Sequence, residues 1–412
     1  MKPMEIRVTF LTPAFLYGAN QSRPEFRIPS LIGQMRYWWR MTQDWSDIEN
    51  LREKEGELFG LVSGNKARAK PFFIHLKEKS GFTMPSPKPV LQGDGKQATD
   101  RLGNLLFQFP SKKQGISYFF YPFMRRPGPF SWLPAQLVVT LCIDFTVSSS
   151  DETMRQVLLS LFLLARFGGL GSRSRRGAGG IEIEGHELFD LTENNLLSYI
   201  IASGDKKTLP CHSYFSQIDS KSPIFRALSN SALRFKQFKP EASTWQEALD
   251  PIGCIMQRFR TKQRLLGGNT SGVDPDFVQE ARDLHQYYEN PSTDPPSVLT
   301  KDAFGLPRAI NFTSCSPAAW NALTISPYKK EGEEIKEMRR ASPLHITVNR
   351  DGNQYYCTLL VLWDLSDNLS FLPDGIDIRI KRRGNKDKDT YPKLDNPKPK
   401  KLEEFLGRIW GA

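Results

Sequence analysis

Residues 168–180 read Gly-Gly-Leu-Gly-Ser-Arg-Ser-Arg-Arg-Gly-Ala-Gly-Gly, so six glycines and three arginines share thirteen positions with no acidic residue. Glycine permits backbone conformations that other residues avoid, and a glycine-rich backbone can bring its N–H groups close to an anion. Together with three guanidinium groups this composition suits a polyanion, and a nucleic-acid backbone is the first candidate. The alternative is a solvated surface turn, which seldom needs so many glycines.

Two common phosphate-binding motifs do not fit this glycine loop. A P-loop needs Gly-Lys-Ser/Thr after four intervening residues, and the corresponding positions after the first three glycines hold only arginine or serine. A dinucleotide fingerprint needs a third glycine where Ser174 stands. Both motifs also lead from a strand into a helix, whereas here the apolar run 157–167 predicts a preceding helix and Ile-Glu-Ile-Glu at 181–184 predicts a following strand.

The first 190 residues predict one α+β domain. Hydrophobic periodicity predicts four strands and two helices, with Ser30 and Asp151 as helix N-caps. The strands are expected at 5–10, 71–77, 136–147 and 181–184, and the helices at 31–43 and 153–167. The order β-α-β-β-α-β is that of ferredoxin-like folds and of the RNA-binding RRM.

An insertion at about 79–134 interrupts this domain. No acidic residue occurs from 101 to 143, and the pair Arg125 and Arg126 is interleaved with aromatic residues. Such a mixture suits single-stranded nucleic acid, because bases stack on aromatic rings while cations meet phosphates. We expect most of these aromatic side chains to lie in the core instead, and the arginine pair to be the better candidate for binding.

Residues 191–412 predict a second α+β domain with helical insertions. Helices are expected at 245–261 and 276–288, and strands at 344–348 and 355–363. Residues 291–296 form a proline-rich loop, and the basic segment 381–401 is predicted to be a hairpin or loop.

The chain has 412 residues, a formal charge of +11 and a pI near 9.3, which favours an acidic partner such as nucleic acid or an anionic membrane. The best apolar run, 157–165, is far too short to span a bilayer, and the N-terminus has no secretory pattern. Five scattered cysteines without a CxxC motif indicate neither a zinc site nor a disulfide framework. We therefore expect a cytoplasmic protein without a membrane partner.

A second unusual segment is Ile-Pro-Ser-Leu-Ile-Gly-Gln-Met-Arg-Tyr-Trp-Trp-Arg at 28–40. On a helix, Arg36 and Arg40 stand four residues apart on one face, where two like charges repel each other. A shared anionic partner would explain the pair, and two ordinary surface arginines beside carboxylates are the alternative.

These motifs resemble a known family. Thr-Phe-Leu-Thr-Pro-Ala-Phe-Leu-Tyr-Gly at 9–18, the segment 28–40, Leu-Phe-Gly at 58–60 and the glycine loop are similar to RAMP proteins, the repeat-associated subunits of CRISPR effector complexes. The paired tryptophans and the Gly-Ser-Arg-Ser-Arg-Arg sequence resemble the first-numbered RAMP subunits of the Cmr, or type III-B, complex. Ala178 departs from the family, in which an aromatic residue is expected after the loop glycine.

The resemblance implies two tandem ferredoxin-like (RRM-like) domains with large insertions, at 1–190 and 191–412. It also implies a non-catalytic, RNA-binding subunit at the head end of a ribonucleoprotein for antiviral defence. The partners would be the 3′ part of the CRISPR guide RNA, the target RNA and other RAMP subunits, with no cofactor and no metal. We expect the RNA-binding residues to be Arg36, Arg40, Arg125, Arg126, Gly169, Gly171, Ser172, Arg173, Ser174, Arg175, Arg176 and Gly177.

Two alternatives stay open. One is a RAMP-type CRISPR RNA endonuclease, for which His212 or His345 could serve as the general base, although no spacing supports this role. The other is an assembly subunit that binds its protein neighbours and hardly touches RNA.

Overall fold

The computed structural model describes residues 3–260 except 64–65, 101, 148, 203–205 and 210, then residues 342–362, and short stretches of helix and strand between 279 and 407. Contacts divide the chain into two units. The first comprises Met1–Cys254 and His345–Leu362, and the second Ile255–Leu344 and Trp363–Ala412. This division does not fall at the expected boundary after residue 190, because the later helices and one hairpin pack into the first unit.

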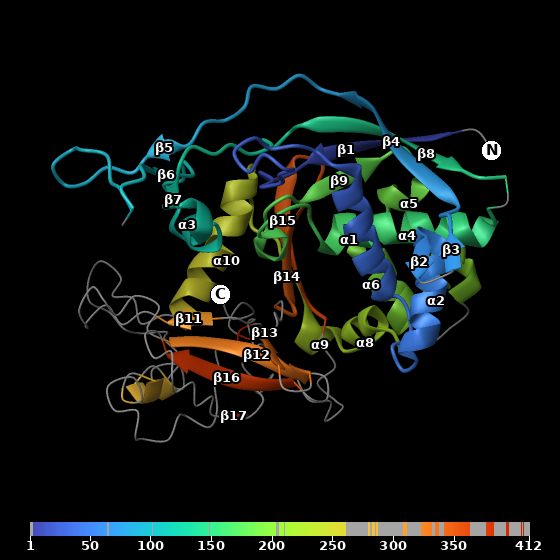
Figure 1. The fold of residues 1–412 in the computed structure, drawn as a ribbon. Coiled ribbons are helices and arrows are strands. Elements are labelled where there is room, and N and C mark those ends of the chain that lie inside the picture. Colours follow the sequence, from blue (N-terminus) through green and yellow to red (C-terminus); the bar gives the residue numbers. More distant parts are fainter. Residues whose placement is uncertain are drawn as a thin grey trace. The chain divides into compact units, whose positions relative to one another are not determined.

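The first unit is built on a four-stranded antiparallel sheet in the order β4-β8-β1-β9 (Figure 1). Two helices connect its strands and pack against each other on one face of the sheet. The six elements are β1 (Met4–Phe10), α1 (Ile28–Arg40), β4 (Phe72–Lys79), β8 (Val138–Phe145), α4 (Asp151–Phe167) and β9 (Ile181–Glu184). Their order along the chain is the predicted β-α-β-β-α-β, so the mixed α+β class is confirmed. A repeat of this arrangement in the rest of the chain stays a prediction.

Both helices bury the apolar stripes that their sequences predict. In α1 these are Leu31, Met35, Trp38 and Trp39, and in α4 the buried side chains include all of 157–165. Both predicted N-caps are wrong. Helix α1 begins three residues before Leu31, since Pro29 fits a first turn, and Ser150 caps α4 by accepting the Thr153 N–H at 3.1 Å.

The opposite face of the sheet carries paired charges. Lys77 pairs with Glu5, and His75 lies 3.1 Å from Asp144 across neighbouring strands. Phe73 is exposed there. Aromatic side chains on an RRM sheet stack with bases, so the exposed Phe73 resembles such a platform, whereas the pairs Lys77–Glu5 and His75–Asp144 do not.

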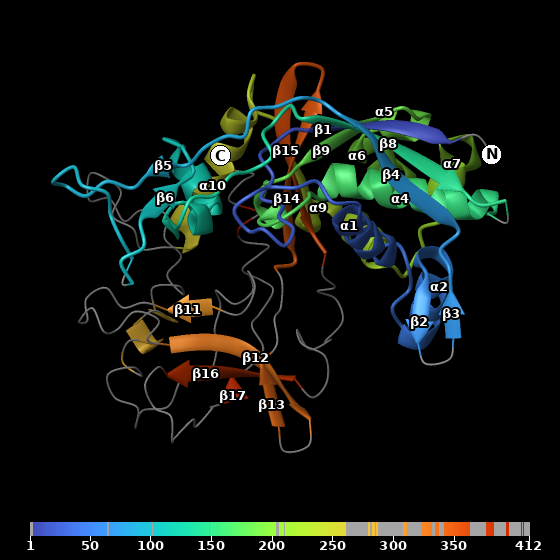
Figure 2. The same cartoon turned by 45° about the horizontal axis from the view of Figure 1, so that its top comes forward.

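The insertion folds as a small three-stranded sheet with short helices between its second and third strands, and it lies next to α10 in both views (Figures 1 and 2). Its elements are β5 (Lys88–Pro89), β6 (Leu106–Gln108), α3 (Gln114–Phe119), η1 (Tyr121–Phe123) and β7 (Arg126–Pro127). The expectation that its aromatic residues are mostly core is confirmed for Phe109, Phe119, Phe120, Phe123, Phe130 and Trp132, all buried. Asp250 of α10 (Trp245–Arg260) anchors the insertion by accepting the Gly115 and Ile116 N–H groups at 2.8 and 3.2 Å.

A hairpin from far along the chain completes the first unit. It consists of β14 (Leu344–Asp351) and β15 (Gln354–Val361), which pairs with β10 (Phe235–Phe238). The Thr347 hydroxyl donates to the Gly168 carbonyl at 3.2 Å, and the Asn349 amide donates to the Arg166 carbonyl at 3.0 Å. The hairpin is therefore attached to the end of α4 and the start of the glycine loop.

Shorter elements surround this framework. They are α2 (Ile48–Phe59), β2 (Leu61–Ser63), β3 (Lys66–Arg68), η2 (Ser174–Arg176), α5 (Glu187–Asp190), α6 (Glu193–Ile201), η3 (Lys206–Thr208), α7 (His212–Phe215), α8 (Pro223–Ser229) and α9 (Ser231–Arg234). The second unit contains a sheet made of β11 (Arg308–Ile310), β12 (Leu323–Glu331), β13 (Glu334–Glu337), β16 (Ile376–Arg382) and β17 (Lys393–Leu394).

Several expectations concern residues that lie largely outside the described part of the chain: the helix at 276–288, the loop at 291–296 and most of the basic segment 381–401. No helix within the described residues is long and apolar enough to span a bilayer.

Candidate nucleic-acid interface

The glycine loop lies between α4 and β9, as predicted, and is folded tightly onto its neighbours. The Leu170 N–H donates to the Gly179 carbonyl at 2.8 Å, so the two arms of the loop are paired with each other. The Gly179 N–H donates to the Pro13 carbonyl and the Ser172 N–H to the Phe15 carbonyl, both at 2.9 Å. The loop therefore also packs against the segment that follows β1.

Close backbone packing explains the glycines. Gly179 has a φ of +64°, and a Cβ there would lie 2.0 Å from the Leu170 carbonyl oxygen. Gly171 has a φ of +90°, and its Cβ would lie 2.6 Å from the Phe15 carbonyl oxygen. Any side chain would push these backbone segments apart, so both positions require glycine for the fold alone.

The turn that carries the arginines directs its N–H groups inward. Arg173 has a left-handed φ of 64°, and its carbonyl accepts the Arg176 N–H at 2.8 Å and the Ala178 N–H at 3.3 Å. Amides that converge in this way could cradle an anion. Here they are occupied by a carbonyl of the same chain, so the arginine side chains are the better candidates for contact with phosphate.

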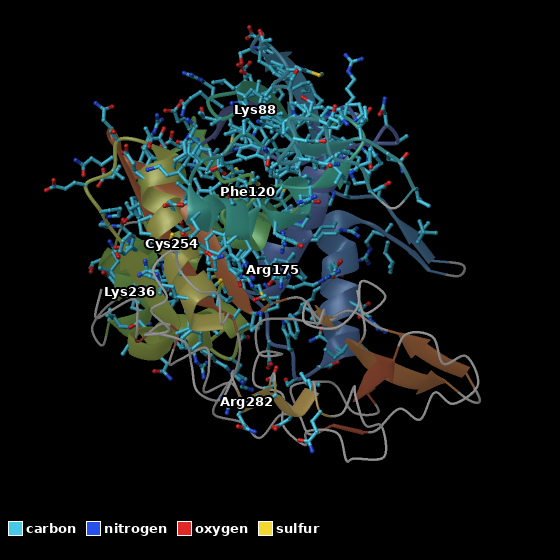
Figure 3. All side chains as sticks on the ribbon, turned by 90° about the vertical axis from the view of Figure 1, so that its left-hand side faces the viewer. Lys88, Phe120, Arg175, Lys236, Cys254 and Arg282 are labelled. Carbon is cyan, nitrogen blue, oxygen red and sulfur yellow. The ribbon has the colours of Figure 1, made fainter. Side chains whose placement is uncertain are left out.

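Arg175 is held against helix α1. Its guanidinium group lies 5.1 Å from the centre of the Tyr37 ring, a cation–π contact, and Figure 3 shows it beside the blue ribbon of α1. Arg175 is partly exposed, whereas Arg176 is buried and donates to the Arg175 carbonyl at 3.1 Å. Tyr37 in turn has its hydroxyl 3.0 Å from Nε2 of His345.

His345 is an uncharged part of the core. It is only 3 % exposed, stacks on Tyr37 and meets the edge of Trp38. Burial, and then the positive charges of Arg175 and Arg176, lower the pKa of His345 well below its ordinary value of 6.5. An imidazole enclosed in this way does not reach the protein surface, which disfavours the hypothesis that it is a general base for RNA cleavage.

Arg36 and Arg40 do share an anionic partner, and it belongs to the chain itself. Arg40 forms a bidentate pair with Glu55 of α2, with its Nε 2.5 Å and its Nη2 2.6 Å from the two carboxylate oxygens. Arg36 lies 3.9 Å from the same carboxylate and donates to the Phe59 and Gly60 carbonyls at 2.8 and 3.0 Å. This arrangement matches the alternative given for the pair, two surface arginines beside a carboxylate. Contact of either arginine with RNA stays a prediction.

Arg126 of the insertion lies against three aromatic rings. Its guanidinium carbon lies 5.3–5.8 Å from the centres of the Tyr17, Phe123 and Phe130 rings, and the group donates to the Gln21 carbonyl at 3.0 Å. Arg125 beside it is exposed.

The segment after β1 links the insertion to the glycine loop. Tyr17 lies under Arg126, and Phe15 forms a β-bridge with Ser172. Among the predicted binding residues, Arg175 therefore lies beside α1, the helix that carries Arg36 and Arg40. Arg126 is connected to the glycine loop through the segment after β1, by way of Tyr17 and Phe15.

No group of three potential metal ligands occurs among the described residues. His212 lies on α7 and packs edge-on against the Tyr199 ring, with centroids 5.8 Å apart.

The fold and this surface define a mixed α+β protein with a basic, partly exposed loop beside its first helix. Residues 7–182 match the sequence model of the RAMP superfamily, which covers the central sheet, both helices and the glycine loop. These residues are therefore similar to RAMP-superfamily domains, and the chain resembles the Cmr1 subunits of CRISPR Cmr systems.

Two relatives from Pyrococcus furiosus support this resemblance. The CRISPR system Cmr subunit Cmr1-2 is 27% identical over 186 residues, which are 42% of this chain and 91% of that protein. Subunit Cmr1-1 is 28% identical over 164 residues, which are 39% of this chain and 41% of that protein.

Solved structures of this kind are also similar. A crystal structure of Cmr1 from Pyrococcus furiosus in its apo form has a TM-score of 0.44 and 17% identity, with 88% of both chains covered. A chain of the type III-B Cmr-beta complex bound to cognate target RNA and AMPPnP has a TM-score of 0.47 and 12% identity, with 99% of both chains covered.

Proposed function

We propose that this chain is a non-catalytic, RNA-binding RAMP subunit of a type III-B Cmr ribonucleoprotein. It takes the head-end position, contacts the 3′ part of the guide RNA and helps to capture the target RNA. Other RAMP subunits are its protein partners, and the second half of the chain repeats the ferredoxin-like fold. The match of 7–182 to the RAMP superfamily and the two Cmr1 relatives support this assignment.

The observation that carries the RNA-binding role is the position of Arg175. The glycine loop holds this guanidinium group over Tyr37 of α1, next to a helix face that also carries Arg36 and Arg40. Neither the loop nor α1 contains an acidic residue. Contacts from arginine to phosphate fix position without reading sequence, which suits a protein whose specificity comes from base pairing of its guide.

Binding of single-stranded RNA at several salt concentrations tests this role. If about five phosphates are neutralised, the logarithm of the association constant should fall with a slope of about −3 to −4 against the logarithm of salt concentration. Arg175→Ala should flatten the slope by about 0.7, because one phosphate contact is lost, and Arg175→Lys should restore most of it. The matched control is Arg7→Ala, since Arg7 lies on the outer face of the sheet, 3.7 Å from Glu184. An unchanged slope in Arg175→Ala would remove the loop from the interface.

Two further measurements separate the alternatives. Incubation of the purified chain with labelled repeat RNA, with and without a chelator, should yield no cleavage. A single clean cut by the chain alone would favour the endonuclease. Co-purification with RAMP subunits, together with RNA binding that is weak and independent of salt, would favour the assembly subunit.

A further inference from the structure

Gly33 is an exposed glycine within a helix, and no contact in the described part of the chain accounts for it. It is the sixth of the thirteen residues of α1, and a Cβ there would meet no described atom within 4 Å. The glycines of α2 and α3 differ. A Cβ at Gly56 would lie 2.9 Å from the Leu61 side chain, and one at Gly115 would lie 2.0 Å from the Asp250 carbonyl oxygen. Glycine in a helix interior is less stable than alanine, so a glycine in open space weakens α1 without improving its packing.

The surroundings of Gly33 are basic. Helical spacing places Arg36 and Tyr37 one turn further along the same side of α1, and Arg175 lies over the Tyr37 ring. The carboxylate of Glu55 on α2 pairs with Arg40, two turns from Gly33, and also lies 3.9 Å from Arg36. As far as the described residues show, the space next to Gly33 is therefore open, and its own helix carries arginines and no acidic side chain.

We propose that the sugar–phosphate backbone of a bound RNA strand crosses α1 at Gly33. The missing side chain lets the strand approach the helix backbone, while Arg175 and Arg36 contact phosphates on either side of the crossing. This inference rests on the RNA-binding function proposed above and adds the path of the strand. Contacts of this kind involve shape and charge only, so the crossing does not depend on RNA sequence.

A protein helix could also pack closely on an exposed glycine. A strand of RNA fits this position better, because the residues that adjoin Gly33 offer cations and a hydrogen-bonding glutamine, Gln34, and a protein partner would have to bury those cations against acidic groups.

The test compares Gly33→Ala and Gly33→Leu with the wild-type chain and with Gly81→Ala. Gly81 also has no described atom beside it and an ordinary backbone conformation, but it lies at the start of the insertion, outside α1. Both Gly33 variants should have a melting temperature equal to or above that of the wild type, since alanine and leucine are good helix formers. RNA affinity should fall about tenfold in Gly33→Leu and less in Gly33→Ala, and Gly81→Ala should bind as the wild type does.

Three outcomes would overturn the inference. If Gly33→Leu binds RNA as tightly as the wild type while Arg175→Ala flattens the salt slope, the strand does not cross at Gly33 and the RNA-binding function still stands. If the wild-type chain shows no salt-dependent RNA binding, the proposed function itself fails. If Gly33→Leu keeps its RNA affinity but no longer associates with the other RAMP subunits, Gly33 belongs to a protein contact.

Discussion

The structural role of the loop glycines predicts a large loss of stability in Gly179→Ala. The left-handed conformation at φ +64° costs a non-glycine residue about 1 to 2 kcal/mol. The new Cβ would also lie 2.0 Å from the Leu170 carbonyl oxygen, so the backbone must separate. That separation breaks or weakens the bonds from Gly179 to Pro13 and from Leu170 to Gly179, at 2.9 and 2.8 Å, each with a net contribution of about 1 kcal/mol. We therefore expect a destabilisation of about 3 to 4 kcal/mol.

Thermal unfolding followed by circular dichroism measures this loss. At about 2 to 4 °C per kcal/mol for a unit of this size, the melting temperature of the first unit should fall by roughly 6 to 16 °C. Gly93→Ala is the control, because a Cβ there meets no described atom and the backbone is not left-handed, so its melting temperature should not change. A Gly179→Ala protein that melts with the wild type but loses RNA affinity would refute the reasoning and would indicate that this glycine contacts the ligand.

Three other predictions follow from named contacts. Glu55→Gln should strengthen RNA binding two- to threefold and steepen its salt slope by about 0.7, because Arg40 loses its carboxylate partner; weaker binding would contradict this. Because burial lowers the pKa of His345, its ring is neutral in the folded and the unfolded protein above pH 6.5, and below that pH only the unfolded protein takes up the proton. The free energy of unfolding should therefore fall by about 1.4 kcal/mol for each pH unit below 6.5. Melting curves recorded from about pH 7.5 to 5 should show this loss in the wild type and not in His345→Gln. Asp250→Ala should make the insertion more sensitive to limited proteolysis than Asp94→Ala does, because α3 loses the carboxylate that accepts its Gly115 N–H.

Local sequence patterns predict the central α+β framework well. Alternation with period two identifies β1 and β9, and the long apolar run identifies α4, since each pattern requires one buried face. The two helix starts were predicted a few residues late, because several residues near each start can serve as the cap. The hairpin β14–β15 was also predicted as strands, but periodicity carries no information on which unit a strand joins, and packing places it in the first.

The candidate site was only half predictable, since its contacts are distant in sequence. The order helix, glycine loop, strand was correct, and Arg175 of the loop lies beside α1. Glu55 was missed because α2 has a weak apolar pattern, and it pairs with an arginine fifteen residues earlier. The contact between Tyr37 and His345 joins residues 308 positions apart, which no spacing rule anticipates.

The glycines and the arginines of one loop can have different roles. The run at 168–180 first indicated a phosphate cradle, yet Gly171 and Gly179 are required where three backbone segments pack, and the Arg173 carbonyl occupies the turn's converging amides. A glycine can indicate a ligand only where no packing requires it, and among the described residues Gly33 meets this condition on a helix that carries arginines. If these roles are separate, Gly179→Ala should reduce the stability of the fold. Arg175→Ala should reduce the salt dependence of RNA binding, and Gly33→Leu should reduce RNA affinity without a change in stability. Three separable effects from one surface would show that the loop's main task is to position a charge beside the helix on which the strand lies.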